Sequence, residues 1–352
     1  MECSTQWGTV LAVRSGAGRQ ELEVRLGAAT AKALNYPEMI GACQVGDRVL
    51  LNTTAVNLRL GTGGWHYVLA VEGRERSLSS RKGHIMKLRY TPLQGRVLAV
   101  EEPDSPYHEA VAQAEELAAL PVAVGSLHSM LAPVAWLLAR NCPRKRLVYL
   151  MSDGAALPLA LSDTAAQLKE QGLIAATITF GHAFGGDWEA VNIYSALLAA
   201  KYAAQADLAV VLMGPGVVGT GTTWGTTAIE QGVFLNAVHH LGGFPVAIPR
   251  LSQGDGRDRH RGLSHHTLTV LRRVVRDPVF LPLPNCFRGF PRWEEQLQDL
   301  PHHIVWEETE EAFQELLRAE FPFFTMGRGL QEDPLFFHGV AAAALFLCRQ
   351  LA

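Results

Sequence analysis

The sequence predicts an α/β protein in which a small, barrel-like β domain precedes a doubly wound, mainly parallel α/β sheet. Two observations predict this fold class. Short runs rich in β-branched residues dominate about the first hundred residues, and from residue 103 onward apolar strands alternate with helical patterns. We therefore expect two domains, residues 1–102 and 103–352, in agreement with the usual domain size of about 100–200 residues.

The composition and net charge of the chain limit the binding partners and the cellular location that we expect. The net charge of −3 provides no general basic surface, so nucleic acid and anionic membranes are not expected partners. The chain opens without the basic and apolar segments of a secretory signal. Its longest apolar run near the C-terminus, residues 339–348, is shorter than the ~20 residues of a membrane span, which predicts a buried helix. Five cysteines lie far apart without a CxxC motif, which indicates free thiols in a reducing cytoplasm: Cys3, Cys43, Cys142, Cys286 and Cys348.

Four short runs predict the strands of the first domain. Each is bounded by Gly, Asn or Asp, which are typical of turns, and their spacing favours a small barrel; they cover residues 7–13, 20–26, 48–52 and 67–71. The sequence GTVLAV at residues 8–13 is nearly repeated as GRVLAV at residues 95–100. We expect the second copy to close the barrel.

A charged, proline-bearing segment, residues 101–106, marks the expected domain boundary. Beyond it, seven apolar runs are separated for the most part by helical patterns. Their continuous rather than alternating hydrophobicity predicts strands that are buried on both faces of a parallel sheet. The runs cover residues 122–124, 147–151, 174–180, 208–213, 245–248, 279–281 and 304–306.

Polar residues follow five consecutive strands of this predicted sheet. Ligands of open α/β sheets bind outside the carboxyl ends of the strands, so we expect these residues to form one ligand-binding rim. They are Ser126, His128 and Ser129 after the first strand, Ser152 and Asp153 after the second, His182 and Asp187 after the third, the turn 214–222 after the fourth, and Arg250, Arg257, Arg259, Arg261, His265 and His266 after the fifth.

The glycine-rich turn is the central candidate for a binding site. Its sequence GPGVVGTGT, residues 214–222, follows a buried strand and precedes a helix expected near Thr223, a layout in which backbone N–H groups hold an anion. A tight connection without a ligand is the alternative. A dinucleotide fingerprint is disfavoured, because the next strand ends in Arg250 rather than in an acidic residue. We expect the anion to contact Gly214, Gly216, Gly219, Thr220 and Gly221, with Arg257 and Arg261 completing the charge.

Histidines and aspartates of the rim are candidates for catalysis. Asp153, His182 and His265 are the expected general acids or bases, and Asp153, His182 and Asp187 are the expected ligands of a divalent metal. The alternative is that Asp153 and Asp187 cap helices and that His182 makes an ordinary hydrogen bond. His265 and His266 are adjacent and would point about 100° apart on a helix, so we expect only one of them to face a ligand.

Five blocks have long and specific sequences: LMSDGAALPLA at residues 150–160, TFGHAFGGDWEAVNIYSAL at 179–197, GPGVVGTGT at 214–222, RGLSHHT at 261–267 and TMGRG at 325–329. They are similar to the blocks of a bacterial family, domain of unknown function 3866, which occurs mainly in Firmicutes. The resemblance extends over nearly the whole chain and implies a cytoplasmic bacterial protein. The family has no established activity, so the resemblance implies no catalytic residue.

Three functions of different classes agree with such a rim. The first is a hydrolase or phosphoryl-transfer enzyme for a small anionic substrate, phosphorylated or nucleotide-like, with Asp153, His182 or His265 as general acid or base. A divalent metal is the cofactor that this function suggests. The second is a non-catalytic sensor of a small anion, and the third is a structural homo-oligomer whose polar rim is an interface.

Overall fold

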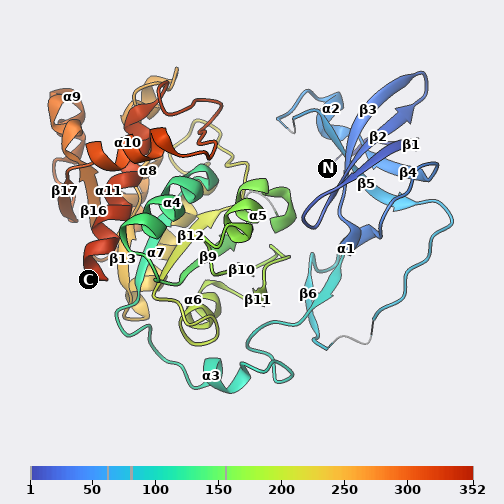
Figure 1. Cartoon of the computed structure of the whole chain (residues 1–352), viewed down its shortest axis with the longest axis horizontal. Helices are drawn as coiled ribbons and strands as arrows, with labels where there is room; N and C mark the ends of the chain where they lie inside the picture. The colour runs from blue at the N-terminus through green and yellow to red at the C-terminus, as the bar shows by residue number, and fades with distance from the viewer. Residues whose placement is uncertain (1, 62, 80–81, 155–156, 352) are drawn as a thin grey trace. The chain divides into compact units, whose positions relative to one another are not determined.

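The chain forms two compact units. Except for the side chains of residues 291 and 292, the computed structural model describes residues 2–61, 63–79, 82–154 and 157–351. One unit comprises Met1–Lys82 and Leu88–Gly95, and the other comprises Gly83–Lys87 and Arg96–Ala352 (Figure 1). The first unit is a β-barrel and the second contains the parallel α/β sheet, which confirms the predicted fold class.

Five described strands close the first unit into a barrel, in the order β1-β2-β3-β5-β4. They are β1 (Thr5–Ser15), β2 (Gln20–Leu26), β3 (Ala29–Asn35), β4 (Arg48–Asn52) and β5 (Trp65–Val71), with the short helices α1 (Pro37–Ile40) and α2 (Thr54–Asn57). β1 pairs with β2 along one part and with β4 along another. A register shift between Val10 and Ala12 bends the strand around the barrel. Side chains of Val10, Leu22 and Val49 fill the interior.

Two features of the barrel differ from the sequence-based expectation. Residues 95–100 do not close it, because β7 (Gly95–Val97) pairs instead with β6 (Ile85–Lys87). The long β1 supplies the closing pair by reaching β4. The additional strand β3 has the sequence ATAKALN, whose alanines are depleted in strands, and this explains why no strand was predicted there.

In the described part of the second unit, eight strands form one sheet in the order β11-β10-β9-β12-β8-β13-β16-β17 (Figure 1). All neighbouring strands are parallel. The seven predicted strands are confirmed, and the three-residue β11 is an addition. The bounds are β8 (Pro121–Gly125), β9 (Leu147–Ser152), β10 (Ala176–Phe180), β11 (Trp188–Ala190), β12 (Leu208–Met213), β13 (Phe244–Ala247), β16 (Phe280–Pro284) and β17 (His303–Glu307).

Helices cover both faces of the sheet. On one face α4, α5, α10 and α11 share a buried apolar cluster with the strands, and on the other α3, α6, α7 and the segment after α8 do so. The bounds are α3 (His108–Ala112), α4 (Leu131–Asn141), α5 (Asp163–Glu170), α6 (Ile193–Tyr202), α7 (Glu230–His240), α8 (His265–Thr269), α9 (Pro291–Glu294), α10 (Glu310–Arg318) and α11 (Pro334–Gln350). Shorter elements are η1 (His128–Met130), η2 (Leu159–Leu161), η3 (Thr227–Ile229), η4 (Asp258–His260), η5 (Val270–Val274), η6 (Asn285–Gly289), η7 (Glu295–Leu297), β14 (Leu251–Ser252) and β15 (Gly262–Leu263).

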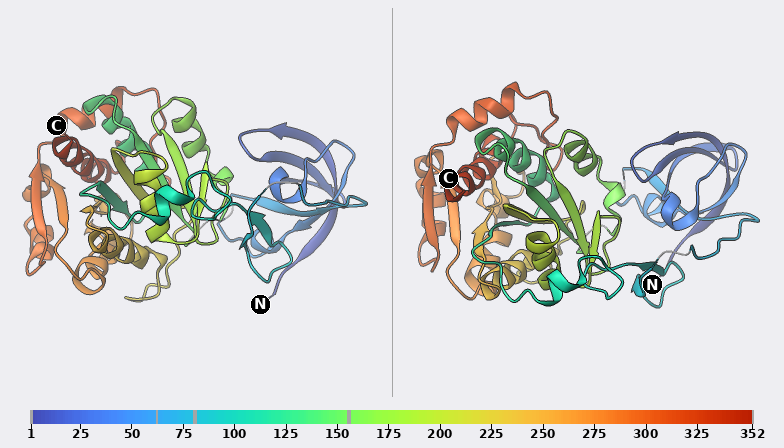
Figure 2. Two further views of the ribbon diagram at one scale, coloured as in Figure 1. Left: turned by 90° about the horizontal axis from the view of Figure 1, so that it is seen from below. Right: turned by 60° about the horizontal axis from the view of Figure 1, so that its bottom comes forward.

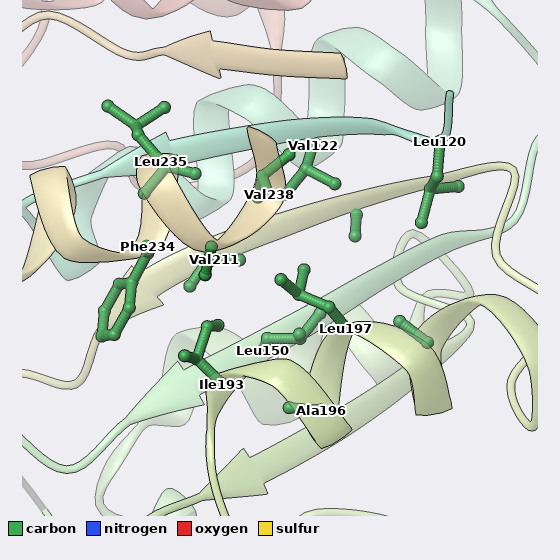
Figure 3. Packing of buried hydrophobic residues seen from close by; sticks show 14 of the residues in the cluster. Leu120, Val122, Leu150, Ile193, Ala196, Leu197, Val211, Phe234, Leu235 and Val238 are labelled. Atoms are coloured by element: carbon green, nitrogen blue, oxygen red, sulfur yellow. The ribbon is translucent and has the colours of Figure 1, made fainter. Parts of the chain in front are cut away.

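The layer formed by α6 and α7 packs on the centre of the sheet. Leu197 of α6 and Val238 of α7 lie in one cluster with Val122 of β8, Leu150 of β9 and Val211 of β12 (Figure 3). These strands are buried on both faces, and this is the physical reason for their continuous apolar sequences.

The apolar run near the C-terminus lies within α11, the dark red helix of Figure 2, which packs against α4. Phe337, Val340 and Leu347 of this helix are buried, so the predicted buried helix is confirmed. Within the described ranges, no helix combines the length and the apolarity that a bilayer crossing requires.

Candidate functional site

The carboxyl ends of the parallel strands meet at one edge of the sheet, which we call the rim. β12 lies between β9 and β8, and β13 lies on the far side of β8. Neighbouring strands are about 4.8 Å apart, so the loops after β9 and β13 are separated by roughly 14 Å. The glycine-rich turn after β12 therefore lies between the acidic residues that follow β9 and the arginines and histidines that follow β13.

The glycine-rich turn, residues 214–222, folds into a small hairpin with the residues that follow it. The N–H of Thr220 donates to the carbonyl of Gly225 at 2.8 Å, and the N–H of Thr227 donates to the carbonyl of Val218 at 3.1 Å. These bonds hold the two sides of the hairpin together, so the turn has a defined shape without any ligand.

The helix expected near Thr223 begins later in the chain. Thr226 caps the one-turn segment η3, its hydroxyl accepting the N–H of Ala228 at 3.3 Å, and α7 follows from Glu230. The hairpin takes up the residues that were expected to form the first helical turn. An anion at the turn would therefore contact N–H groups of the hairpin itself rather than a helix N-terminus.

The residues predicted to bind an anion differ in their burial and in the hydrogen-bond donors that they present. Gly216, Gly219, Thr220 and Gly221 are exposed, whereas Gly214 is buried at the end of β12. Gly216 and Gly221 have φ angles of 101° and 79°, which favour glycine. Thr220 uses its N–H and its hydroxyl within the hairpin. Among the hydrogen bonds of the described residues, none uses the N–H groups of Gly216, Gly219 or Gly221, and these are the donors that the turn presents.

Asp153 and His182 lie together at the ends of β9 and β10. The carboxylate of Asp153 accepts the backbone N–H of His182 at 2.7 Å. The hydroxyl of Ser152 donates to Oε2 of Glu230 at 2.9 Å and so places that carboxyl group at the same part of the rim. Burial, with the nearby carboxylate of Asp153, raises the pKa of Glu230. Glu230 is therefore a further candidate for a general acid, which the sequence alone did not single out.

Asp187 lies at the other end of β10. Because β11 is parallel to β10, residues 181–187 return the chain toward the start of β10 before β11 begins. There the Asp187 carboxylate accepts the N–H and the hydroxyl of Thr177, at 2.9 and 3.0 Å, and pairs with Lys169. Although burial opposes the shift, the hydrogen bond from Lys169 lowers the pKa of Asp187. The structure does not bring Asp187 to Asp153 and His182, so the metal site predicted from these residues is not formed.

The loop after β13 is organised around the buried carboxylate of Asp255. Arg257 donates to both of its oxygens, while Arg250 and Arg328 lie 3.3 and 3.6 Å from Oδ2. The hydrogen bonds from Arg257 hold the pKa of Asp255 far below its usual range. Arg261 donates through Nε to the backbone oxygen of Asp255 at 3.0 Å. Both arginines predicted to bind an anion are thus fixed by the same aspartate.

A second buried carboxylate, that of Asp333, connects this loop to α11. It accepts the hydroxyl of Ser252 at 2.6 Å and the N–H groups of Gln253 and Gly254 at 2.9 and 3.1 Å. Arg328 donates to it through Nε at 3.0 Å. Because Asp333 directly precedes the first residue of α11, the start of the loop is held by the N-terminal end of a long helix.

Three histidines converge further along the same loop. One ring nitrogen from each of His260, His265 and His266 lies within 4.8 Å of the others. The rings of His265 and His266 have centroids 4.2 Å apart, although the residues are neighbours at the start of α8. The structure differs here from the expectation that only one of them faces a ligand. Rotation about each Cα–Cβ bond, together with the position of His260 in η4, compensates for the angle between successive helical residues.

The nitrogen atoms of this cluster fit a metal site. Nε2 of His265 and Nδ1 of His266 are buried and have no hydrogen-bond partner among the described residues. Such orphaned polar atoms are costly in a folded protein unless something binds them. Nδ1 of His260 contacts the hydroxyl of Ser264 at 2.8 Å, which orients the ring. Imidazole nitrogens oriented by a second hydrogen bond are the usual ligands of Zn²⁺ and related cations.

Burial keeps these imidazoles neutral. It lowers the pKa of His260 to about 3 and that of His266 to about 4, and the nearby arginines add to the effect. The pKa of His265 is lowered in the same direction, again mainly by burial. Since the neutral ring is the form that binds a metal, the cluster is ready to ligate throughout the neutral pH range.

The histidine cluster borders the glycine-rich turn. A Cβ atom built on Gly219 would lie 3.5 Å from Cε1 and 3.6 Å from Nε2 of His266. Gly219 of the turn and His266 of the cluster are therefore neighbours at the rim.

His128, the polar residue after β8, has a more enclosed position. Its Nδ1 contacts the hydroxyl of Tyr149 at 3.2 Å, and its Nε2 contacts the hydroxyl of Ser162 at 2.6 Å. Burial lowers the pKa of His128 to about 4. Ser162 also caps α5, so His128 connects the end of β8 to that helix.

Several residues of the site were missed by sequence reasoning. His260 had a usable signal, because the spacing HxxxxHH of residues 260–266 puts three imidazoles within a short loop. Asp333 had no such signal in the sequence, since its partner Ser252 is 81 residues away. Arg328 belongs to the TMGRG block, but only the folded chain brings it to Asp255.

The fold and the rim define a class of protein: a barrel unit and a parallel α/β unit whose strand ends carry a histidine cluster, an arginine loop and a glycine-rich hairpin. The chain belongs to the family described as Protein of unknown function (DUF3866), whose family model matches residues 32–344. The match includes all the rim residues described above, and it confirms the resemblance found in the sequence blocks. No curated protein matches the chain.

Proposed function

We propose that the protein is a metal-dependent hydrolase or phosphoryl-transfer enzyme that acts on a small anionic substrate at the rim. The observation that carries the proposal is the convergence of His260, His265 and His266 beside Gly219. These three neutral imidazoles would hold a Zn²⁺ ion, and sets of three protein ligands are typical of catalytic rather than structural zinc sites.

Each part of the rim has a role in this proposal. The histidine cluster would hold the cation, which would supply Lewis-acid activation of water. Arg261 and the N–H groups of Gly216 and Gly219 bind the anionic group of the substrate. Asp153 and Glu230, on the other side of the turn, are the candidates for proton transfer to the leaving group. His265 thus acts as a ligand rather than as the general acid or base expected from the sequence.

Electrostatics favour joint binding of a cation and an anion. Three guanidinium groups, those of Arg250, Arg257 and Arg328, face two carboxylates, those of Asp255 and Asp333. The remaining positive charge opposes a bare cation and attracts an anion. Phosphate should therefore strengthen the binding of Zn²⁺, and Zn²⁺ should strengthen the binding of phosphate by the same factor.

A non-catalytic sensor of a small anion is the second candidate. One observation favours it: the guanidinium of Arg257 is already occupied by the Asp255 carboxylate, so a stronger anion can compete with that carboxylate and rearrange the loop. A structural homo-oligomer whose rim is an interface is the third. A cytoplasmic location, in which free thiols are kept reduced, belongs to the same set of proposals.

Calorimetric titration of Zn²⁺ into the chelator-treated full chain, with and without phosphate, tests the proposal. We expect one Zn²⁺ per chain, tighter binding in phosphate, and loss of binding in His260→Ala and His266→Ala. His240→Ala, at an exposed position of α7, is the matched control. Zinc-dependent hydrolysis of p-nitrophenyl phosphate or a nucleotide would support the enzyme.

The outcomes separate the three candidates. Saturable binding of zinc and phosphate without turnover would support the sensor. A change of oligomeric state in His266→Ala, without any zinc binding by the wild type, would support the structural role. Absence of saturable zinc binding by the wild type would overturn the metal-dependent mechanism.

A further inference from the structure

Two cysteines from distant parts of the sequence meet where two packed helices end. Cys142 is the C-cap residue of α4, and Cys348 lies in the last turn of α11, the helix that packs against α4. The Cys348 thiol donates a hydrogen bond to the sulfur of Cys142, with the two sulfurs 2.8 Å apart. Both are free thiols and both are half-buried, so the contacting pair remains accessible from solvent.

A basic hollow opens beside Cys142. It has a volume of about 310 Å³ and is lined by Cys142 together with Arg144, Lys145 and Arg146. It also touches Leu147, the first residue of β9, which places it at the amino end of the sheet, away from the rim. A hollow of this charge suits a small molecule that carries carboxylates.

The two thiols have different reactivities. The hydrogen bond from Cys348, with the charge of Lys145, lowers the pKa of Cys142 against the effect of burial. The same hydrogen bond and burial raise the pKa of Cys348. Because the thiolate is the nucleophile, Cys142 attacks first and Cys348 follows.

We propose that Cys142 and Cys348 form a thiol–disulfide exchange site whose reactant is a small disulfide bearing carboxylates. The Cys142 thiolate attacks one sulfur of that disulfide, whose S–S bond breaks and releases one thiolate. Cys348 then loses its proton to solvent, and its sulfur attacks Cys142 in the mixed disulfide, releasing the second thiolate. Two protein thiols are oxidised to one disulfide, and the small disulfide is reduced to two thiols; an excess of small thiol reverses the exchange.

The new bond would join the C-terminal ends of α4 and α11 across 206 residues of sequence. Constraining so long a loop reduces the freedom of the unfolded chain, so the oxidised protein should melt about 10 °C higher. The N-terminal ends of the same helices lie near His128 and Asp333, so the bond also fixes the two helices whose first residues border the rim.

Oxidised glutathione, a disulfide with several carboxylates, is the probe. The full chain is incubated with it, then analysed by thiol titration, non-reducing peptide mapping and thermal melting. We expect the wild type to lose two titratable thiols, to gain the link between Cys142 and Cys348, and to melt at a higher temperature. Cys348→Ser should stop at a glutathionyl adduct on Cys142, whereas Cys142→Ser should leave Cys348 reduced. Cys286→Ser is the control that should behave as wild type.

Two other results would contradict the exchange site. Adducts that form on Cys3 or Cys286 as fast as on Cys142, with no link to Cys348, would overturn the proposal. So would an adduct on Cys348 in Cys142→Ser at the rate seen for Cys142 in Cys348→Ser. None of these readouts depends on metal or phosphate binding at the rim.

Discussion

The guanidinium of Arg257 binds the carboxylate of Asp255 through two hydrogen bonds of 2.9 Å each, and its backbone N–H donates to the same carboxylate at 3.0 Å. A protein carboxylate therefore already occupies the position that an anionic ligand would take on Arg257. Arg261 bonds through Nε to a backbone oxygen of Asp255, and its side chain is half exposed. Arg261 is therefore the arginine better placed to take a further anion.

The first prediction concerns this difference between the two arginines. Phosphate, sulfate or a nucleotide should raise the melting temperature of the wild type, and Arg261→Ala should lose most of the increase. A charge-assisted hydrogen bond contributes about 1.5–3 kcal/mol, so the affinity should fall roughly tenfold or more. Arg257→Ala should lose less, because Asp255 competes for that side chain. Differential scanning fluorimetry over a phosphate titration gives the measurement.

Arg276→Ala, an exposed substitution on the segment after η5, is the matched control for that experiment. Equal phosphate shifts in Arg261→Ala and Arg276→Ala would show that the loop does not bind the anion. Gly216→Val is a less clean probe, because the φ of 101° at Gly216 strains any other residue.

The second prediction concerns pH. Burial lowers the pKa of His128 and His266 to about 4 and that of His260 to about 3, while an unfolded histidine titrates near about 6.5. Below about pH 6.5 the unfolded chain takes up protons that the folded chain does not, so stability falls as pH falls toward 4. Each histidine changes the free energy of unfolding by at most about 1.4 kcal/mol per pH unit in that window. Above the window it leaves the free energy of unfolding unchanged.

Urea unfolding at pH 7, 6 and 5 measures this dependence. Protonation of carboxylates with lowered pKa, such as Asp255, also destabilises the folded protein in acid, but mainly below this window. The informative quantity is therefore the difference between the wild type and His266→Gln, which should be less sensitive to acid between pH 7 and 5. Identical pH profiles for the two proteins would contradict the neutral state assigned to His266.

The third prediction concerns the buried ion pair between Lys87 and Glu189. The ammonium of Lys87 lies 3.3 Å from Oε2 of Glu189 and also donates to the carbonyl of Gly181 at 2.8 Å. Lys87→Met leaves the Glu189 carboxylate buried without its cation, so the free energy of unfolding should fall by about 3 kcal/mol. The double variant with Glu189→Gln should recover most of this loss, because no unpaired charge remains.

Lys32→Met, an exposed substitution in the barrel, controls for the loss of a lysine. Urea unfolding of the full chain compares these three variants with the wild type. If the double variant is as unstable as Lys87→Met, the loss comes from the packing of the lysine rather than from the charge of Glu189.

The fourth prediction concerns the boundary between the units. The sequence places it at residues 101–106, whereas the structure assigns the chain from Arg96 onward to the α/β unit. There the carboxylate of Glu102 accepts the N–H groups of His84 and Ala99, at 2.7 and 2.6 Å, and is buried. Residues 72–79 are exposed throughout, so we expect the first proteolytic cut there.

Brief digestion with trypsin or a glutamate-specific protease, followed by mass spectrometry of the fragments, decides between the two positions. A first cut within residues 72–79, which precede Gly83, and a stable C-terminal fragment would show that the α/β unit begins before residue 101, as the contacts indicate. A first cut within residues 101–106 would favour the boundary read from the sequence.

The sequence by itself determined the layers of this protein. A central strand of the parallel sheet is buried on both faces, so it must be apolar at every position, and residues 147–151 and 208–213 satisfy that requirement visibly. Parallel strands also bring their carboxyl ends to one edge, so the position of the rim followed from the order of strands and helices. Asp153, His182 and the glycine-rich turn were placed at that rim for this reason.

Only the tertiary structure decided which polar residues meet. The parallel pairing of β11 with β10 carried Asp187 to the far end of its strand, because the connection had to return before β11 began. The side chains of His260, His265 and His266 converge through rotations about single bonds, which the sequence does not specify. Asp333 reaches Ser252 from a distant segment, because α11 packs beside the loop. Strand burial acts along the local chain and leaves a pattern in the sequence. The contact between Asp333 and Ser252 depends instead on packing between segments far apart, which leaves none.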